Sequence, residues 1–171
     1  KAKIKKSLQG LKVATHYGCH ILHPRKIACF DNPLAPSIFD QLLELSGAVC
    51  VSYPNHYSCC GFSICGIDAT LSMDLAQRKI SAAARAGADL LCTVCPNCQL
   101  QFDKVQKIIV SQRGANFSLP SVSFAQLFGI SLGIDMAIMG FDQHEFNAAE
   151  VLNRRAANVS QSLHCRSVSG G

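Results

Sequence analysis

The sequence predicts an α/β fold: a small parallel sheet of about four strands with helices on both faces, and a cysteine cluster site at the carboxyl edge of the strands. Two observations support this prediction. Short apolar runs alternate with helical patterns along the 171 residues, which is typical of parallel strands joined by crossover helices. Cysteines follow three of these runs, and open α/β sheets bind their ligands at the edge where parallel strands end.

The first strand-helix unit starts with the apolar run 11–17, which we expect to be a buried strand that leads straight to Cys19. A loop rich in His, Pro, Asp and Asn follows. Pro36 is suited to open a helix and Gly47 to close it. Three residues recur on one side of this helix and are its expected buried face: Ile38, Leu42 and Leu45.

The second unit has a short apolar strand at 48–53 and a loop at 54–66 that holds the adjacent pair Cys59 and Cys60. Asp68 is a candidate cap for the next helix, and Gly87 marks its end. Five residues form the expected apolar stripe of this helix: Ile67, Leu71, Leu75, Ile80 and Ala84.

The third strand is expected at 88–94, and Cys95 follows it at once. Pro96 suits the first turn of a helix that buries Phe102, Val105 and Ile109 before Gly114. A fourth short strand at 120–123 and a short helix at 124–133 complete the series.

We therefore divide the chain into a basic lead-in at 1–10, a cluster-binding domain at 11–143 and a C-terminal part at 144–171. The last part is expected to contain a helix from His144 to about Asn158 and a disordered Ser- and Gly-rich tail. The sequence begins at Lys1 and not at a methionine, which leaves two alternatives open: a preceding segment, or a chain that works with this unit alone.

Composition excludes several classes of protein. With 49% hydrophobic and 16% charged residues the chain can bury a real core. No apolar run approaches the roughly 18 residues of a membrane span, and no secretory signal is present, so a soluble cytoplasmic protein is expected. The net charge of +5 comes from the ends, because positions 13–150 hold eight Lys and Arg against all eleven Asp and Glu; nucleic-acid binding is not expected.

Five cysteines are the candidate metal ligands and the candidate catalytic residues, acting through the metal: Cys19, Cys59, Cys60, Cys95 and Cys98. Adjacent cysteines cannot easily bond each other, so a shared metal centre is the simplest partner for the pair at 59 and 60. Thiolates select zinc, copper(I) and iron-sulfur centres. Five ligands exceed the four of a structural zinc or a cubane, which indicates a larger or distorted cluster.

Two other interpretations of the cysteines stay open. In the first, four of them hold zinc in a structural or docking module of a quinone-linked or other oxidoreductase complex. In the second, Cys95 and Cys98 form a redox dithiol at a helix start. His20 and His56 are candidates to donate a hydrogen bond to a metal-bound sulfur. Cys50 and Cys92 lie within predicted strands, where we expect them to pack as small hydrophobes.

The cysteine motifs resemble those of a known family. Tyr17-Gly18-Cys19, Cys59-Cys60-Gly61 and Cys95-Pro96-Asn97-Cys98 are similar, at these separations, to the cysteine-rich CCG domain found in the B subunit of heterodisulfide reductase and its relatives. The resemblance covers roughly 11–140 and includes Asp31-Asn32-Pro33, Ala86-Gly87-Ala88-Asp89 and the segment around Gln126-Leu127. The B subunit carries two such units, and this chain shows one, most like the C-terminal unit; it is either half of such a protein or a protein with a single cluster.

The resemblance implies that the five cysteines hold a noncubane 4Fe-4S cluster that takes part in disulfide reduction or thiol oxidation. It also implies three partners: the ferredoxin-like C subunit and the flavin-containing A subunit of a heterodisulfide reductase-like complex, and a disulfide or thiol substrate. Components of quinone-linked succinate or fumarate reductases and lactate-oxidation proteins also carry the domain, so the substrate stays open.

Overall fold

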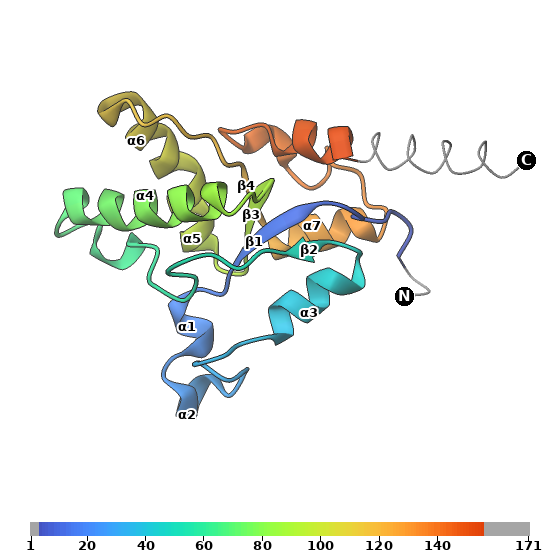
Figure 1. The fold of residues 1–171 in the computed structure, drawn as a ribbon, viewed down its shortest axis with the longest axis horizontal. Helices are drawn as coiled ribbons and strands as arrows, with labels where there is room; N and C mark the ends of the chain where they lie inside the picture. The colour runs from blue at the N-terminus through green and yellow to red at the C-terminus, as the bar shows by residue number, and fades with distance from the viewer. Residues whose placement is uncertain (1–3, 156–171) are drawn as a thin grey trace, which may run out of the picture.

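A four-stranded parallel sheet forms the centre of the computed structural model, which describes residues 4–155 (Figure 1). Its strands are β1 (Lys12–His16), β2 (Val49–Cys50), β3 (Leu90–Thr93) and β4 (Ser121–Ser123), and their spatial order is β2-β1-β3-β4. In the register of β1 and β3, Val13 pairs with Leu90 and His16 with Thr93. The predicted fold class is confirmed, with strands shorter than the apolar runs that predicted them.

Helices cover both faces of the sheet. The face shared by α3 (Ile38–Leu45) and α7 (Phe124–Ser131) lies opposite the face covered by α4 (Ala69–Arg85), α5 (Pro96–Leu100) and α6 (Gln106–Arg113) (Figure 1). Two short helices, α1 (Cys19–Leu22) and α2 (Arg25–Ala28), project from the end of β1.

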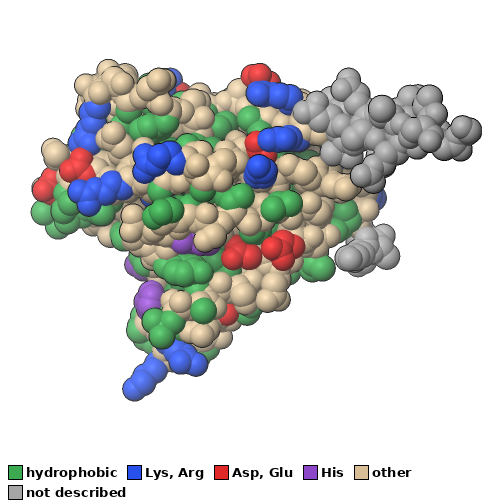
Figure 2. Space-filling model, in the orientation of Figure 1, with side chains coloured by type: hydrophobic (Ala, Val, Ile, Leu, Met, Phe, Trp, Pro, Cys, Tyr) green, Lys and Arg blue, Asp and Glu red, His purple; other side chains and the backbone are tan. Residues whose placement is uncertain are grey.

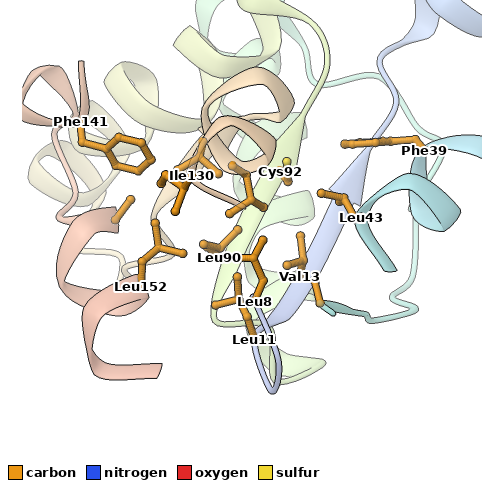
Figure 3. Packing of buried hydrophobic residues seen from close by; sticks show 14 of the residues in the cluster. Leu8, Leu11, Val13, Phe39, Leu43, Leu90, Cys92, Ile130, Phe141 and Leu152 are labelled. Atoms are coloured by element: carbon orange, nitrogen blue, oxygen red, sulfur yellow. The ribbon is translucent and has the colours of Figure 1, made fainter. Parts of the chain in front are cut away.

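Successive side chains of each strand point to opposite faces of the sheet and pack in two hydrophobic cores, one on each face. Val13 and Cys92 pack with Phe39 and Leu43 of α3, as Figure 3 shows. Ala14 belongs instead to the core on the α4 side. This alternation is what a parallel sheet covered on both faces requires.

Two predicted helix faces were wrong. In α3, Ile38 and Leu45 are exposed, while Phe39 and Leu43 are buried. The Phe39 ring packs edge-on against Tyr17 and Phe124, with ring centroids 5.3 and 5.4 Å apart, and these aromatic contacts select the buried face.

In α4 the buried positions are mostly small or polar, and only one predicted stripe residue is fully buried, Ile80. Ile67 is 89% exposed and Leu71 is 40% exposed. Ala76 and Ala83 are fully buried. Their small side chains allow α4 to lie close to the sheet and to the loop that carries Cys59 and Cys60.

The helix predicted after Pro96 is interrupted. A π-helical turn, η2 (Gln101–Val105), separates α5 from α6. The amide of Gln106 donates to the carbonyls of Phe102, at 2.6 Å, and Leu119, at 2.9 Å. A side chain that binds the carbonyl four residues earlier competes with the α-helical backbone bond, which explains the wider turn.

The predicted C-terminal helix begins later than expected. A 3-10 turn, η3 (Phe141–Gln143), precedes it, and residues 148–155 are helical. The predicted end near Asn158 and the predicted disordered tail lie outside the described residues. Between positions 4 and 155, the structure contains no helix with the length and apolar character needed to span a membrane.

Candidate metal centre

The loops after β2, β1 and β3 meet at the carboxyl edge of the sheet, where the order of the strands makes them neighbours. Gly18 allows the first loop to approach the third. Its φ of 77° lies in the left-handed region, and a Cβ there would come within 3.1 Å of the Cys95 Cβ and 3.7 Å of the Cys98 Sγ. A glycine is therefore needed at this position for both conformational and steric reasons.

Gly61 fixes the loop that carries the cysteine pair. Its φ is 93°, and a Cβ would lie 2.6 Å from the carbonyl oxygen of Ser72 in α4. The Ser72 hydroxyl donates to the Gly61 carbonyl at 2.9 Å, and the Gln101 amide donates to the Ser72 carbonyl and hydroxyl. Hydrogen bonds between buried groups thus hold Cys60 against α4 and η2.

Three buried residues come together at this edge. The ligand atoms of His16, Cys60 and Cys98 all lie within 4.8 Å of one another. All three residues are at most 4% exposed. Among residues 4–155 this is the only such group of three or more His, Cys, Asp or Glu side chains.

The two buried thiols share their protons unequally. A hydrogen bond with the Cys98 thiol holds the pKa of Cys60 well below its usual range, against the opposing effect of burial. The same hydrogen bond, together with burial, raises the pKa of Cys98. The pair is therefore predisposed to hold one thiolate and one thiol, and the thiolate is the form that binds metals.

The other three predicted ligands border this group. Cys19, Cys59 and Cys95 are half-buried. Burial raises the pKa of Cys19, and the charges of Cys59 and Cys60 add to the effect; Cys95 in turn acts on the pKa of Cys98. These interactions link all five thiols into one patch, although only Cys60 and Cys98 belong to the compact group of three.

His16 was missed as a site residue. Neither of its ring nitrogens makes a well-formed hydrogen bond among the described residues. Burial lowers the pKa of His16 more than the neighbouring Cys60 thiol raises it, so the neutral ring is favoured. Its position at the end of β1, on the same side as Ala14, was the available signal, because Cys60 and Cys98 pack into the core that contains Ala14.

Neither histidine named from the sequence belongs to this group of three, although His56 is close enough to His16 for the two rings to affect each other's charge. His20 is exposed. His56 pairs with the Thr15 hydroxyl at 2.8 Å and stacks on Tyr57, with centroids 4.6 Å apart. Figure 2 shows histidine side chains beside hydrophobic ones where the lobe of α1 and α2 joins the body.

The remaining cysteines divide by burial. Cys92 is fully buried, as predicted, whereas Cys50 is only partly buried. Cys29 and Cys65 are exposed. Cys165 lies outside the described residues.

Comparison with known proteins places these motifs in a family. A family model described as a cysteine-rich domain, CCG, matches residues 13–103. The B subunit of the ferredoxin/F(420)H(2)-dependent CoB-CoM heterodisulfide reductase of Methanosarcina acetivorans is 35% identical over 144 residues, which cover 83% of this chain and 48% of the relative. The B subunit of the ferredoxin:CoB-CoM heterodisulfide reductase of Methanosarcina mazei is 34% identical over the same shares.

A third relative belongs to a different enzyme. The membrane anchor subunit of the 8-methylmenaquinol:fumarate reductase of Wolinella succinogenes is 32% identical over 151 residues, which cover 88% of this chain and 53% of the relative. The chain therefore spans about half the length of the curated relatives it matches.

Proposed function

The chain belongs to the cysteine-rich domain (CCG) family, and from this premise we propose that it is the cluster-binding unit of an oxidoreductase component similar to the B subunit of heterodisulfide reductase. In this proposal residues 11–143 form the working unit. Cys19, Cys59, Cys60, Cys95 and Cys98 hold a noncubane 4Fe-4S cluster that takes part in disulfide reduction or thiol oxidation.

The observation that carries the proposal is the convergence of His16, Cys60 and Cys98, one from each of three strand-loop units. The other three thiols act electrostatically on this group or on one another. The donors fit a thiophilic centre, because Cys60 already favours the thiolate and no carboxylate of residues 4–155 enters the group of three. The five linked thiols exceed what a single tetrahedral ion takes, which supports a cluster of several metal atoms.

When bound, such a cluster supplies one-electron chemistry at sulfur. The chain's own residues provide the conditions for it. Gly18 and Gly61 let the loops converge, α4 and η2 shield the inner thiols from water, and His16 offers a neutral ring nitrogen beside Cys60. Ligation by both thiolates would require Cys60 and Cys98 to give up the proton between them, so uptake of the centre would become weaker as the pH falls.

The proposed partners follow from the relatives. Two of them are named as components of heterodisulfide reductases and one as a membrane anchor of a fumarate reductase. We propose that this unit receives electrons from a ferredoxin-like C subunit, supplied by a flavin-containing A subunit, and that its substrate is a disulfide or a thiol.

One observation favours a second candidate, a zinc-binding structural or docking module. His16, Cys60 and Cys98 form a nitrogen and two-sulfur donor set, which zinc accepts readily. Zinc cannot pass electrons, so metal identity separates the two functions.

Iron, acid-labile sulfide and zinc are to be measured on anaerobically purified protein, together with the electron paramagnetic resonance spectrum of the oxidised form. The proposal expects about four irons and four sulfides per chain, and a signal that changes when thiols are added. One zinc and no iron, persisting after anaerobic reconstitution, would favour the docking module.

The ligand assignment is tested with Cys60→Ser, which removes a buried thiol of the central group. We expect it to lose most of the iron and the signal. Cys65→Ser is the matched control, since it changes an exposed thiol in the same loop and should keep both. Equal iron content in the two variants would contradict the assignment.

A further inference from the structure

Lys79 is a fully buried lysine on the face of α4 that covers the candidate metal centre. Its ammonium donates to the backbone carbonyls of Asn55, at 2.6 Å, and His56, at 2.8 Å. It also lies 5.6 Å from the centroid of the Tyr53 ring. These contacts attach α4 to the turn that immediately precedes Cys59 and Cys60.

The turn needs such a partner because of its conformation. Asn55 has a φ of 63°, in the left-handed region, and its carbonyl also accepts from the backbone N–H and the hydroxyl of Ser58. A left-handed non-glycine residue costs conformational energy that surrounding contacts must offset. The Lys79 bonds to Asn55 and His56 are suited to hold this turn in place.

No carboxylate balances the Lys79 charge. Within the described range 4–155, no Asp or Glu oxygen lies within 4.0 Å of its ammonium. Burial lowers the pKa of Lys79 to about 8, and the groups that oppose this shift are the thiols of Cys60, Cys98 and Cys59. A buried charge requires a partner, and here the only negative groups in reach are the predicted metal ligands.

We propose that Lys79 is the built-in counter-charge of the metal centre and positions the loop that presents Cys59 and Cys60. The inference rests on the proposed function, since it assumes that thiolates at this site hold a metal. A centre ligated by several thiolates carries net negative charge, which a buried ammonium stabilises more strongly than a surface charge can. For a redox centre the same charge favours the reduced, more negative state and so raises the reduction potential.

The test compares three variants of the full chain with wild type after anaerobic reconstitution with iron and sulfide, and separately with zinc. Lys79→Met removes the charge and both hydrogen bonds to the turn while keeping an unbranched side chain that is one atom shorter. Lys79→Gln removes the charge but keeps an amide donor for the carbonyls. Arg78→Met is the matched control, because it removes one positive charge from the neighbouring, exposed position of the same helix.

Three quantities are measured: metal and sulfide content, the rate at which a chelator removes the metal, and the midpoint potential of the iron-loaded protein. We expect both Lys79 variants to lose metal about ten-fold faster than wild type, the scale of effect seen for residues that support metal ligands. Their midpoint potential should shift to more negative values. Arg78→Met should match wild type in both measurements.

The outcomes separate this inference from the proposed function. In one outcome, wild type takes up iron or zinc and the Lys79 variants lose the metal at the same rate as wild type. If iron is bound, their midpoint potentials also match. That outcome refutes only the role of Lys79. If wild type takes up neither metal, both are refuted. If both Lys79 variants fail to fold while Arg78→Met folds, Lys79 is a structural residue and the counter-charge role is wrong.

Discussion

At the scale of single residues, the site combines two thiols that favour one thiolate with two basic groups buried beside them. Cys60 and Cys98 share a proton, His16 is neutral, and Lys79 is held by carbonyls. Burial lowers the pKa of both His16 and His56. The charge of Lys79 lowers both pKa values further, and His16 also lowers the pKa of His56. These two histidines are therefore neutral at pH 7.

His56 gives a prediction for pH dependence. Burial, with the charges of Lys79 and His16, lowers its pKa to about 4 from 6.5. A histidine whose pKa is lower in the folded state is protonated first in the unfolded state, so the stability it contributes is complete above about pH 6.5 and is lost as the pH falls toward 4. His56→Gln keeps a partner for the Thr15 hydroxyl but removes the titration.

We expect the metal-free wild type to lose about 2 kcal/mol more unfolding free energy than His56→Gln between pH 7 and about pH 4.5. Urea unfolding of both proteins at several pH values measures this difference. His20→Gln, which changes an exposed histidine, should follow the wild-type curve. Parallel curves for wild type and His56→Gln would show that His56 does not carry the effect.

The sequence named the five cysteines as candidates but not the bases beside them. Cysteine spacing is a strong signal, because each motif follows a strand whose end position is fixed by the fold. The burial of Lys79 could not be predicted from the sequence. A lysine in a helix is normally expected to face solvent, and only the folded structure shows that this side of α4 packs against the loop that carries the cysteine pair. The contacts of Lys79 with Asn55 and His56 depend on the course of a loop more than 20 positions earlier.

At the scale of elements, helix ends were predicted better than helix faces. Asp68 caps α4 by accepting from the backbone N–H of Leu71 at 2.9 Å, and Pro96 opens α5. Caps are local, so sequence alone specifies them. The buried face of α3 depends on the rings of Tyr17 and Phe124, which come from distant segments. For that reason the face predicted from the spacing of apolar residues was displaced by one residue.

Gly61 allows a prediction about how an element holds the site. Gly61→Ala would place a methyl group 2.6 Å from the Ser72 carbonyl oxygen and would also strain a left-handed residue. We expect a loss of about 3 kcal/mol of unfolding free energy, the sum of about 1 kcal/mol for the conformation and about 2 kcal/mol for the overlap with a rigid helix backbone. Chemical denaturation of the metal-free protein measures it.

Gly87→Ala is the control for Gly61→Ala. Gly87 also has a positive φ, of 80°, but a Cβ there meets no atom within 4 Å. It should therefore lose only the conformational part, about 1 kcal/mol. Equal losses of unfolding free energy in the two variants would mean that the contact between the cysteine loop and α4 can accommodate a methyl group.

At the scale of the whole molecule, the site joins three strand-loop-helix units that the two hydrophobic cores already bring together. Cys60 and Cys98 belong to the core on the α4 side, while Cys19 follows β1, the central strand of three that end at the site. A metal bound by all three loops would connect α1, the loop after β2 and α5. Such links bind the folded chain and not the unfolded one, so they couple metal binding to stability.

Metal removal should therefore lower the stability of the whole described unit, which should still unfold in a single cooperative transition. For a centre present at about a thousand-fold above its dissociation constant, the linkage amounts to about 4 kcal/mol, or roughly 10 °C in Tm for a chain of this size. Anaerobic calorimetry of the reconstituted protein, before and after chelation, measures the shift. Cys65→Ser should show the full shift and Cys60→Ser little of it, because only Cys60 belongs to the central group. A reconstituted protein that unfolds at the same temperature as the metal-free one would indicate that the metal is bound outside the three loops.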